Sequence, residues 1–359
     1  MPQNSRNATL TLREHLATRD NALNFVRLLL ATIVIFAHSW LLGGFEGGPR
    51  IDFGAWAVHG FFAISGYLIA GSRMRLGLRE FMANRALRIF PAFWSVLIGV
   101  ALVVAPVLSF IEGWEYSVSN AVGYIVKNAG LYIFQPKIYN TLEGMPFPWY
   151  WNGSLWTLFF EFAAYVGAGL LLTFAIARRR PVVVVGTLLA SSIVVQYILV
   201  EHLGVEEDFV LKALRLAPYF LAGMLIYFVS DRIQVRTSYF LAALLIFIAL
   251  IPLGLADMFG QIPLSFAILW LGAKLPVRLG ARNDISYGIY IWGWPMQLVV
   301  LALGGEMLGA PLAGLLAFAC SIPLALASWH FVEKPAMKLR RHLPRAWSAR
   351  PTSTTESSR

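Results

Sequence analysis

A carboxylate and an imidazole within apolar stretches are the strongest candidates for chemistry in this 359-residue chain. Glu161 is the only acidic side chain in the stretches that we assign to the membrane, and His38 lies on the first of them. A charged side chain at the centre of a helix in hydrocarbon costs about 2.5–3.5 kcal/mol on insertion scales, so it usually faces a polar interior. A carboxylate beside an imidazole fixes its tautomer and makes it a better acceptor of a hydroxyl proton. We therefore predict that His38 and Glu161 are catalytic.

The positions of the two residues along their helices favour such a contact. Arg27 and His38 are eleven residues apart, which places them on one helical face about 16 Å apart. The first stretch runs outward and the fourth runs inward, so His38 and Glu161 are expected at similar depths in the outer leaflet. The alternative is structural, with His38 reaching the interface and Glu161 holding two helices together.

Arginines near the opposite surface form a second group. The run NRALRIFP, residues 84–91, places Arg85 and Arg88 on one helical face, where two guanidinium groups can bind one phosphorylated ligand. Arg27 is expected at the same depth, and its own helix supplies no anion for it. We predict that these three arginines bind a phosphorylated ligand. The alternative is that arginines at a cytoplasmic helix end only fix the orientation of the protein.

Aromatic residues mark the other surface. The longest loop, about residues 112–153, contains the run MPFPWYW. Aromatic rings pack against the C–H faces of sugars, so the candidates for substrate binding are Trp149, Trp151, Trp156 and the nearby Arg215. Aromatic side chains at membrane surfaces more often anchor a protein at the lipid headgroups, and this alternative stays open.

The composition indicates a membrane protein. The chain is 58% hydrophobic and 13% charged, whereas soluble domains are about one-quarter charged. We predict an all-α, polytopic bundle of about ten transmembrane helices, since ten apolar runs approach the length that crosses about 30 Å of hydrocarbon. These runs cover about residues 24–42, 55–71, 91–111, 154–176, 182–200, 214–229, 238–253, 259–272, 285–303 and 311–332.

Charge along the loops predicts the orientation. Lys and Arg gather in alternate loops, whereas the loop 201–208 holds four acidic residues and no Lys or Arg. Because short cytoplasmic loops are rich in Lys and Arg, both termini are predicted to be cytoplasmic. The expected organisation is a cytoplasmic segment at 1–20, a transmembrane domain at 21–335 and a basic, disordered cytoplasmic tail at 336–359. The expected location is a bacterial inner membrane.

Several functions are disfavoured by what the chain contains. Its formal charge of +10 is spread over the inner loops and forms no single basic stripe, so we expect no nucleic-acid partner. Cys320 is the sole cysteine, which excludes an intrachain disulfide and a cysteine-based metal site. We therefore predict no bound metal.

Six short runs resemble motifs of acyltransferase family 3, a family of integral-membrane O-acyltransferases. The resemblance extends from about Asn21 to Pro335. In chain order the runs are the pair Arg27 and His38, FFAISGYLI at 61–69, NRALRIFP at 84–91, SLWTLFFE at 154–161, SYGIYIWGWP at 286–295 and FVEKP at 331–335.

The resemblance implies an activity and roles. Members transfer an acyl group, commonly acetyl from acetyl-CoA, to a sugar hydroxyl of a surface polysaccharide, glycolipid or secreted glycoside. It implies that His38 is catalytic and that Arg85 and Arg88 handle the CoA donor, with Arg27 and Glu161 as further functional positions. Acyl-CoA is then a co-substrate, and no bound cofactor is expected. The implied partners are acyl-CoA, a carbohydrate acceptor and the bilayer.

Two positions depart from the family pattern, and alternatives remain. Gly293 stands where many members have His, and His59 where many have an acidic residue or Gln, which leaves Glu161 as the better carboxylate partner for His38. The imidazole serves as general base or as carrier of a covalent acyl group. A transporter or flippase for a lipid-linked sugar or small anion is the alternative function, although we find no paired, Gly/Pro-broken halves.

Overall fold

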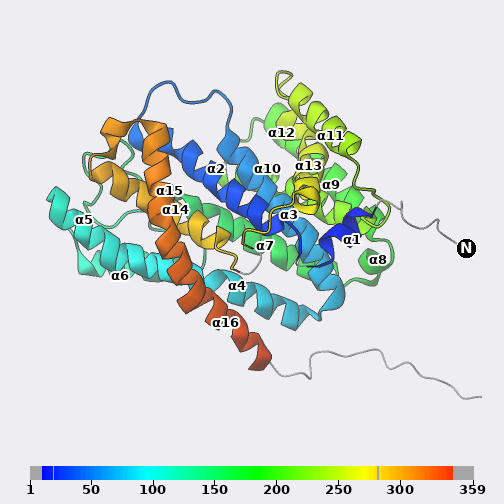
Figure 1. Ribbon diagram of the computed structural model, residues 1–359, viewed down its shortest axis with the longest axis horizontal. Coiled ribbons are helices and arrows are strands. Elements are labelled where there is room, and N and C mark those ends of the chain that lie inside the picture. Colours follow the sequence, from blue (N-terminus) through cyan, green and yellow to red (C-terminus); the bar gives the residue numbers. More distant parts are fainter. Residues whose placement is uncertain (1–9, 19, 281–282, 343–359) are drawn as a thin grey trace, which may run out of the picture.

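A computed structural model describes residues 10–18, 20–280 and 283–342 of the chain. Regular structure in these ranges is helical, apart from one isolated bridge between Thr11 and Gln234. Figure 1 shows α2, α3 and α10 running through the middle of the molecule, with α5 and α6 at one end and α1 and α8 at the other. The predicted all-helical bundle is therefore confirmed.

Within the described ranges, seven helical stretches are long and apolar enough to cross a membrane. They contain α2 (Leu23–Gly43), α3 (Phe53–Arg75), α4 (Leu78–Gly99) continued by α5 (Ala105–Glu112), α7 (Trp156–Leu171), α9 (Pro181–Tyr197), α10 (Asp208–Val229) and α15 (Ala310–Ala327). The other three predicted spans form shorter helices, which are α11 (Thr237–Leu250), α13 (Gln261–Lys274) and α14 (Ser286–Ala302). Every apolar run predicted from the sequence is thus helical, and the chain is a multi-pass membrane protein.

Short helices connect or flank these long ones. They are α1 (Leu12–Leu16), α6 (Val118–Asn128), α8 (Ala175–Arg179), α12 (Ala256–Phe259) and α16 (Lys334–Lys338). A 3₁₀ turn after α16 continues to His342, so residues 336–342 are helical and the expectation of disorder there is wrong. The rest of the expected tail, 343–359, lies outside the described residues, as do residues 1–9 of the N-terminal segment.

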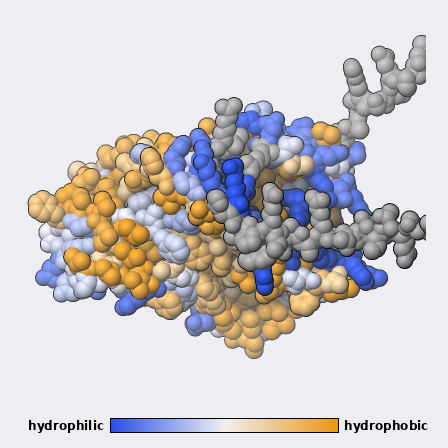
Figure 2. Space-filling model, turned by 90° about the horizontal axis from the view of Figure 1, so that it is seen from below, coloured by the Kyte–Doolittle hydropathy of each residue, from blue (hydrophilic) through white to orange (hydrophobic). Residues whose placement is uncertain are grey.

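Charged side chains are unevenly distributed over the molecule. We call the end of the bundle that carries Arg75, Arg85 and Arg88 the basic end; α2 and α4 begin near it and α3 ends there. Figure 2 shows hydrophilic residues gathered at one side of the face in view and hydrophobic residues over much of the rest. Such a surface suits a protein whose flank faces lipid and whose ends face water.

Helices α3 and α10 cross backbone to backbone. A Cβ atom built on Gly66 would lie 2.0 Å from the carbonyl oxygen of Phe220, and one built on Gly223 would lie 2.0 Å from that of Ala63. Reciprocal glycines of this kind allow membrane helices to approach closely. The structure therefore supports a packing role for Gly66 and shows that the neighbouring backbone fills the space beside it.

Replacing Gly66 with alanine is expected to destabilise the bundle by about 1–3 kcal/mol or more, because the added methyl group meets rigid backbone. The measurement is the thermal unfolding temperature of the purified protein in detergent. Gly167→Ala in α7 is the control, since nothing lies within 4 Å of its added Cβ. Equal unfolding temperatures for both variants would contradict the close crossing.

Candidate active site

Four charged side chains form a network at the basic end. One oxygen of Asp284 accepts hydrogen bonds from Arg27 at 2.7 Å and from Arg88 at 2.6 Å, and Arg88 also donates to Glu333 at 2.8 Å. The other oxygen of Asp284 accepts a hydrogen bond from Ser286 at 2.6 Å. The side chains of Asp284 and Glu333 are only 14% and 1% exposed, so water screens the network little. It joins α2, α4, the loop before α14 and the π-helical segment that follows α15, Ser328–Glu333.

This network supplies the anion that Arg27 needs. The anion is Asp284, which reasoning from the sequence missed because it lies outside the apolar runs. The available signal was its position two residues before the run SYGIYIWGWP, in an otherwise basic turn. Arg27 and Arg88 therefore have carboxylate partners within the protein.

Arg85, unlike these two arginines, has no ion-paired carboxylate partner in the described part of the chain. Its Nε is buried, and no hydrogen bond or ion pair engages its guanidinium among the described residues. The group lies 5.9 Å from the ring centre of Phe81 and interacts electrostatically with Tyr165 and Glu161. The side-chain oxygen of the adjacent Asn84 is also buried without a partner. A half-buried cation with free donors is suited to bind an anionic ligand.

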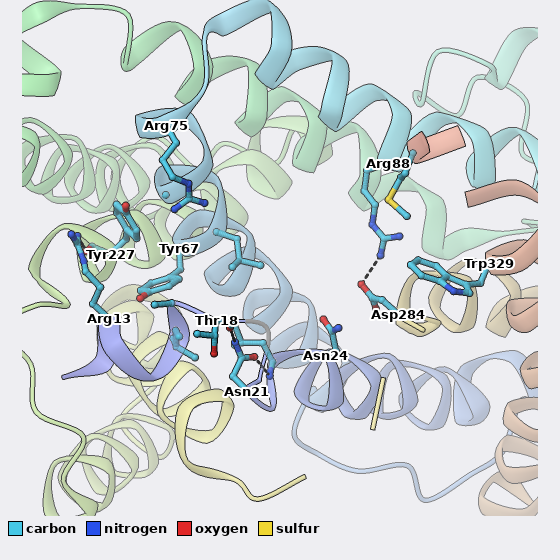
Figure 3. A pocket seen from close by; sticks show the side chains of 16 residues that line it. Arg13, Thr18, Asn21, Asn24, Tyr67, Arg75, Arg88, Tyr227, Asp284 and Trp329 are labelled. Atoms are coloured by element: carbon cyan, nitrogen blue, oxygen red, sulfur yellow. Dashed lines mark hydrogen bonds and ion pairs between the residues drawn. The ribbon is translucent and has the colours of Figure 1, made fainter. Parts of the chain in front are cut away.

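Two adjoining cavities lie at the basic end. Their volumes are about 700 and 410 Å³, and their walls share Leu68, Arg75, Arg88 and Met337. Asp284 is the only carboxylate in either wall among the described residues. Arginines line the combined wall: Arg13, Arg75, Arg85, Arg88 and Arg340. Figure 3 shows the larger cavity. The cavity volumes are those of a ligand site, and the positive charge of the wall suits a phosphorylated ligand.

Glu161 is held by hydroxyl groups in the bundle. Ser65 donates a hydrogen bond to its Oε1 at 2.6 Å, and the Tyr165 hydroxyl donates to the same atom at 2.5 Å. Glu161 and Arg27 both line a small cavity of about 30 Å³ that also reaches Tyr287. The carboxylate is thus associated with the arginine side of the site.

His38 has other neighbours, and its expected contact with Glu161 is not formed. The half-buried imidazole packs edge-on against Trp294, with ring centres 4.8 Å apart. The carboxylate with a favourable electrostatic interaction with this ring is Asp52, at the start of α3. Helix α7 packs mainly on α4 and α3, whereas α2 packs mainly on α14, α3 and α15. The predicted pairing of His38 with Glu161 is therefore wrong: no hydrogen bond or ion pair joins them among the described residues, and α7 and α2 both pack on α3 but not extensively on each other.

The two departures from the family pattern have packing explanations. A Cβ atom on Gly293 would lie 2.6 Å from Cγ1 of Ile35, so α14 approaches α2 where a histidine would not fit without displacing that side chain. His59 is 4% exposed and stacks on Tyr219 with ring centres 4.0 Å apart. Neither residue supplies a second acid or base beside His38.

The aromatic candidates fall into different environments. Trp151 is fully buried and donates a hydrogen bond to Thr141 at 2.7 Å, so it has no ring face open to a sugar and its predicted role in binding is wrong. Trp149 is 58% exposed, with the Lys137 ammonium 5.2 Å from its ring centre. Trp156 lines a cavity of about 130 Å³. Arg215 is exposed and lines none of the cavities described here.

Comparison with known proteins identifies the family of this chain. A family described by its acyltransferase domain, acyltransferase family 3, matches residues 20–330. Nodulation protein 10 of Rhizobium leguminosarum bv. viciae is 27% identical over 92% of this chain and 96% of its own length. The O-acetyl transferase of Shigella phage Sf6 is 28% identical over 88% of this chain and 96% of its own. No solved structure matches the chain significantly.

The family match covers every helix from α2 to α15, and with them all the residues of the ion network except Glu333. It supports group transfer over the alternative of a transporter, and it confirms the resemblance found in the sequence motifs. The chain belongs to acyltransferase family 3 and is an integral-membrane O-acyltransferase.

Proposed function

We propose that this enzyme transfers an acetyl group from acetyl-CoA to a sugar hydroxyl of a surface polysaccharide, glycolipid or secreted glycoside, with His38 as general base. The observation that carries the proposal is the pair of arginine-lined cavities at the basic end, in whose wall Arg85 has no partner. The excess of arginine at this end favours a cytoplasmic location, where acyl-CoA is available. The similarity to the phage O-acetyl transferase supports acetyl as the group transferred.

In this proposal, each arginine of the basic end has a distinct role in donor binding. Arg85 offers unused donors to a phosphate, and Glu161 balances its charge from within the bundle. Arg88 uses two of its five N–H donors on Asp284 and Glu333, which fixes the guanidinium in the cavity wall with donors to spare. Arg27 extends the same network to α2, the helix that carries His38. The donor site and the base thus share a rigid element.

The transfer step requires a base at the acceptor hydroxyl. As His38 removes the hydroxyl proton, the oxygen attacks the thioester carbonyl carbon; a C–O bond forms, the C–S bond breaks and the CoA sulfur leaves with the proton. The contact with Trp294 orients the ring, and Asp52 stabilises its protonated form. His38 lies about 16 Å along α2 from Arg27, so only the extended thioester arm of the donor would reach it.

A small aromatic cavity is the best candidate for the acceptor. It has a volume of about 130 Å³ and is lined by Trp156, Phe159, Phe209 and the ion pair of Lys212 with Asp208. The Lys212 ammonium lies 4.8 Å from the ring centre of Trp156. Ring faces beside a polar pair suit the C–H and O–H groups of a sugar.

Replacing Arg85 with glutamine is expected to raise the KM for acetyl-CoA about tenfold or more and to change the KM for the acceptor little, because a charge-assisted contact to phosphate is lost. The measurement is label transfer from radiolabelled acetyl-CoA in membranes containing the enzyme. Arg79→Gln is the matched control, since Arg79 lies on the same helix and lines neither cavity. A change confined to the acceptor KM would place the donor elsewhere.

A further inference from the structure

The N-terminal helix α1 is attached firmly to the rest of the protein, although it lies outside the family match. Leu12 and Leu16 are 0% and 7% exposed, and the Leu12 amide donates to the carbonyl of Ile233 at 2.8 Å. A capping box between Thr11 and Glu14 starts the helix. This segment is therefore part of the folded structure at the basic end.

Arg13 of α1 is held in the wall of the 700 Å³ cavity. Its Nη2 donates to the carbonyl of Tyr227 at 3.0 Å and its Nε to Ser230 at 3.2 Å. The guanidinium carbon lies 4.7 Å from the centre of the Tyr227 ring. These contacts use only part of its hydrogen-bonding capacity and fix the position of its charge.

The cavity has two cationic ends. Figure 3 shows one group of labelled side chains around α1 and the end of α3, and a second group across the cavity. The first group is Arg13, Arg75, Tyr67 and Tyr227, and the second is Arg88, Asp284 and Trp329. A ligand that spans the cavity would therefore meet positive charge at two separate points.

The charge of the two ends is balanced differently. Arg88 is paired with two carboxylates, whereas no ion pair engages Arg13 or Arg75 among the described residues. Arg75 is exposed and makes no hydrogen bond there either. Asp231 is close enough to interact electrostatically with Tyr67, but it is exposed and does not line the cavity. The end near α1 thus has the larger uncompensated positive charge.

We infer that Arg13 and Arg75 form a second phosphate-binding subsite, which makes the N-terminal helix a determinant of donor specificity. The inference rests on the proposed use of acetyl-CoA. Coenzyme A carries phosphate at two separated places, the diphosphate bridge and the 3′-phosphate of the ribose. The thioester arm extends from the diphosphate, so the diphosphate belongs beside Arg85 and Arg88, and the 3′-phosphate belongs beside Arg13 and Arg75.

The test compares the binding of acetyl-CoA with that of 3′-dephospho-acetyl-CoA to the purified full-length protein by calorimetry, which needs no acceptor. The wild type should bind acetyl-CoA about tenfold or more tightly. In Arg13→Gln and in Arg75→Gln, the two affinities should become nearly equal, through loss of acetyl-CoA affinity alone. Arg75→Gln breaks no contact within the protein, so its result holds even if Arg13→Gln loosens α1.

The control is Arg278→Gln, which removes an arginine that pairs with Asp20 and lines neither cavity. It should retain the wild-type preference. Equal affinity of the wild type for both ligands, or an equal weakening of both by Arg75→Gln, would overturn the second subsite while leaving acetyl-CoA as the donor. Failure of the wild type to bind either ligand would overturn both this subsite and the proposed donor.

Discussion

Replacing His38 with alanine is expected to lower acetyl transfer by about 10²–10⁴-fold while the protein remains folded in the membrane. The imidazole is half-buried against Trp294 and makes no hydrogen bond among the described residues, so its removal breaks few structural contacts. The loss should appear in kcat, because the base acts in the transfer step and the donor arginines remain in place. The measurement is label transfer from radiolabelled acetyl-CoA at saturating donor.

A second histidine provides the control. His330 is exposed, and its Nδ1 lies 2.9 Å from the carbonyl oxygen of Leu326 on the same helical segment. His330→Ala makes the same side-chain change at a second position and should leave kcat unchanged. Near-wild-type transfer by His38→Ala, with normal protein levels, would show that His38 is not the general base.

Replacing Asp284 with asparagine is expected to destabilise the protein by about 3–5 kcal/mol, because Arg27 and Arg88 would lose the carboxylate they share in a poorly hydrated site. The measurement is thermal unfolding of the purified protein in detergent at neutral pH. Asp20→Asn is the control: Asp20 pairs with Arg278 at an exposed site, where such a pair contributes about 0.2–1 kcal/mol. Equal effects of the two variants would contradict the structural importance of the network.

The same variant should change how stability depends on pH. Burial alone would raise the pKa of Asp284, but Arg27 and Arg88, with help from Ser286, bring it below the usual value for aspartate. A depressed pKa in the folded state means that this carboxylate stabilises the protein above its unfolded pKa of about 3.9. That stability is lost as the pH falls through the folded pKa. Acid should therefore destabilise the wild type more than Asp284→Asn.

The sequence predicts most of the fold because membrane insertion depends on local composition. Each of the ten apolar runs is long enough to be recognised without knowing its neighbours, and each is helical in the structure. The basic end could be located for the same reason, since the arginines of residues 84–91 stand out beside an apolar run. The motif order identified the family, which the comparisons confirm.

The parts of the site that the sequence could not predict are contacts between distant segments. The ion network joins residues 196 to 257 positions apart, and nothing local shows that Asp284 faces Arg27 and not water. Depth along a helix axis likewise suggested that His38 and Glu161 meet, but depth does not specify which helices are neighbours. Trp151 was misassigned because a tryptophan in an outer loop has the same sequence signature whether buried or exposed.

The most direct test follows a labelled acetyl group from one side of the membrane to the other. Sealed inside-out vesicles from cells that make the enzyme would receive radiolabelled acetyl-CoA on the side of the basic end. Label should appear in glycan or glycolipid with the wild type, should fall at least a hundredfold with His38→Ala, and should be unaffected by His330→Ala. Label that stays in CoA with the wild type would contradict transfer across the membrane, and label that reaches the acceptor equally with His38→Ala would contradict His38 as the base.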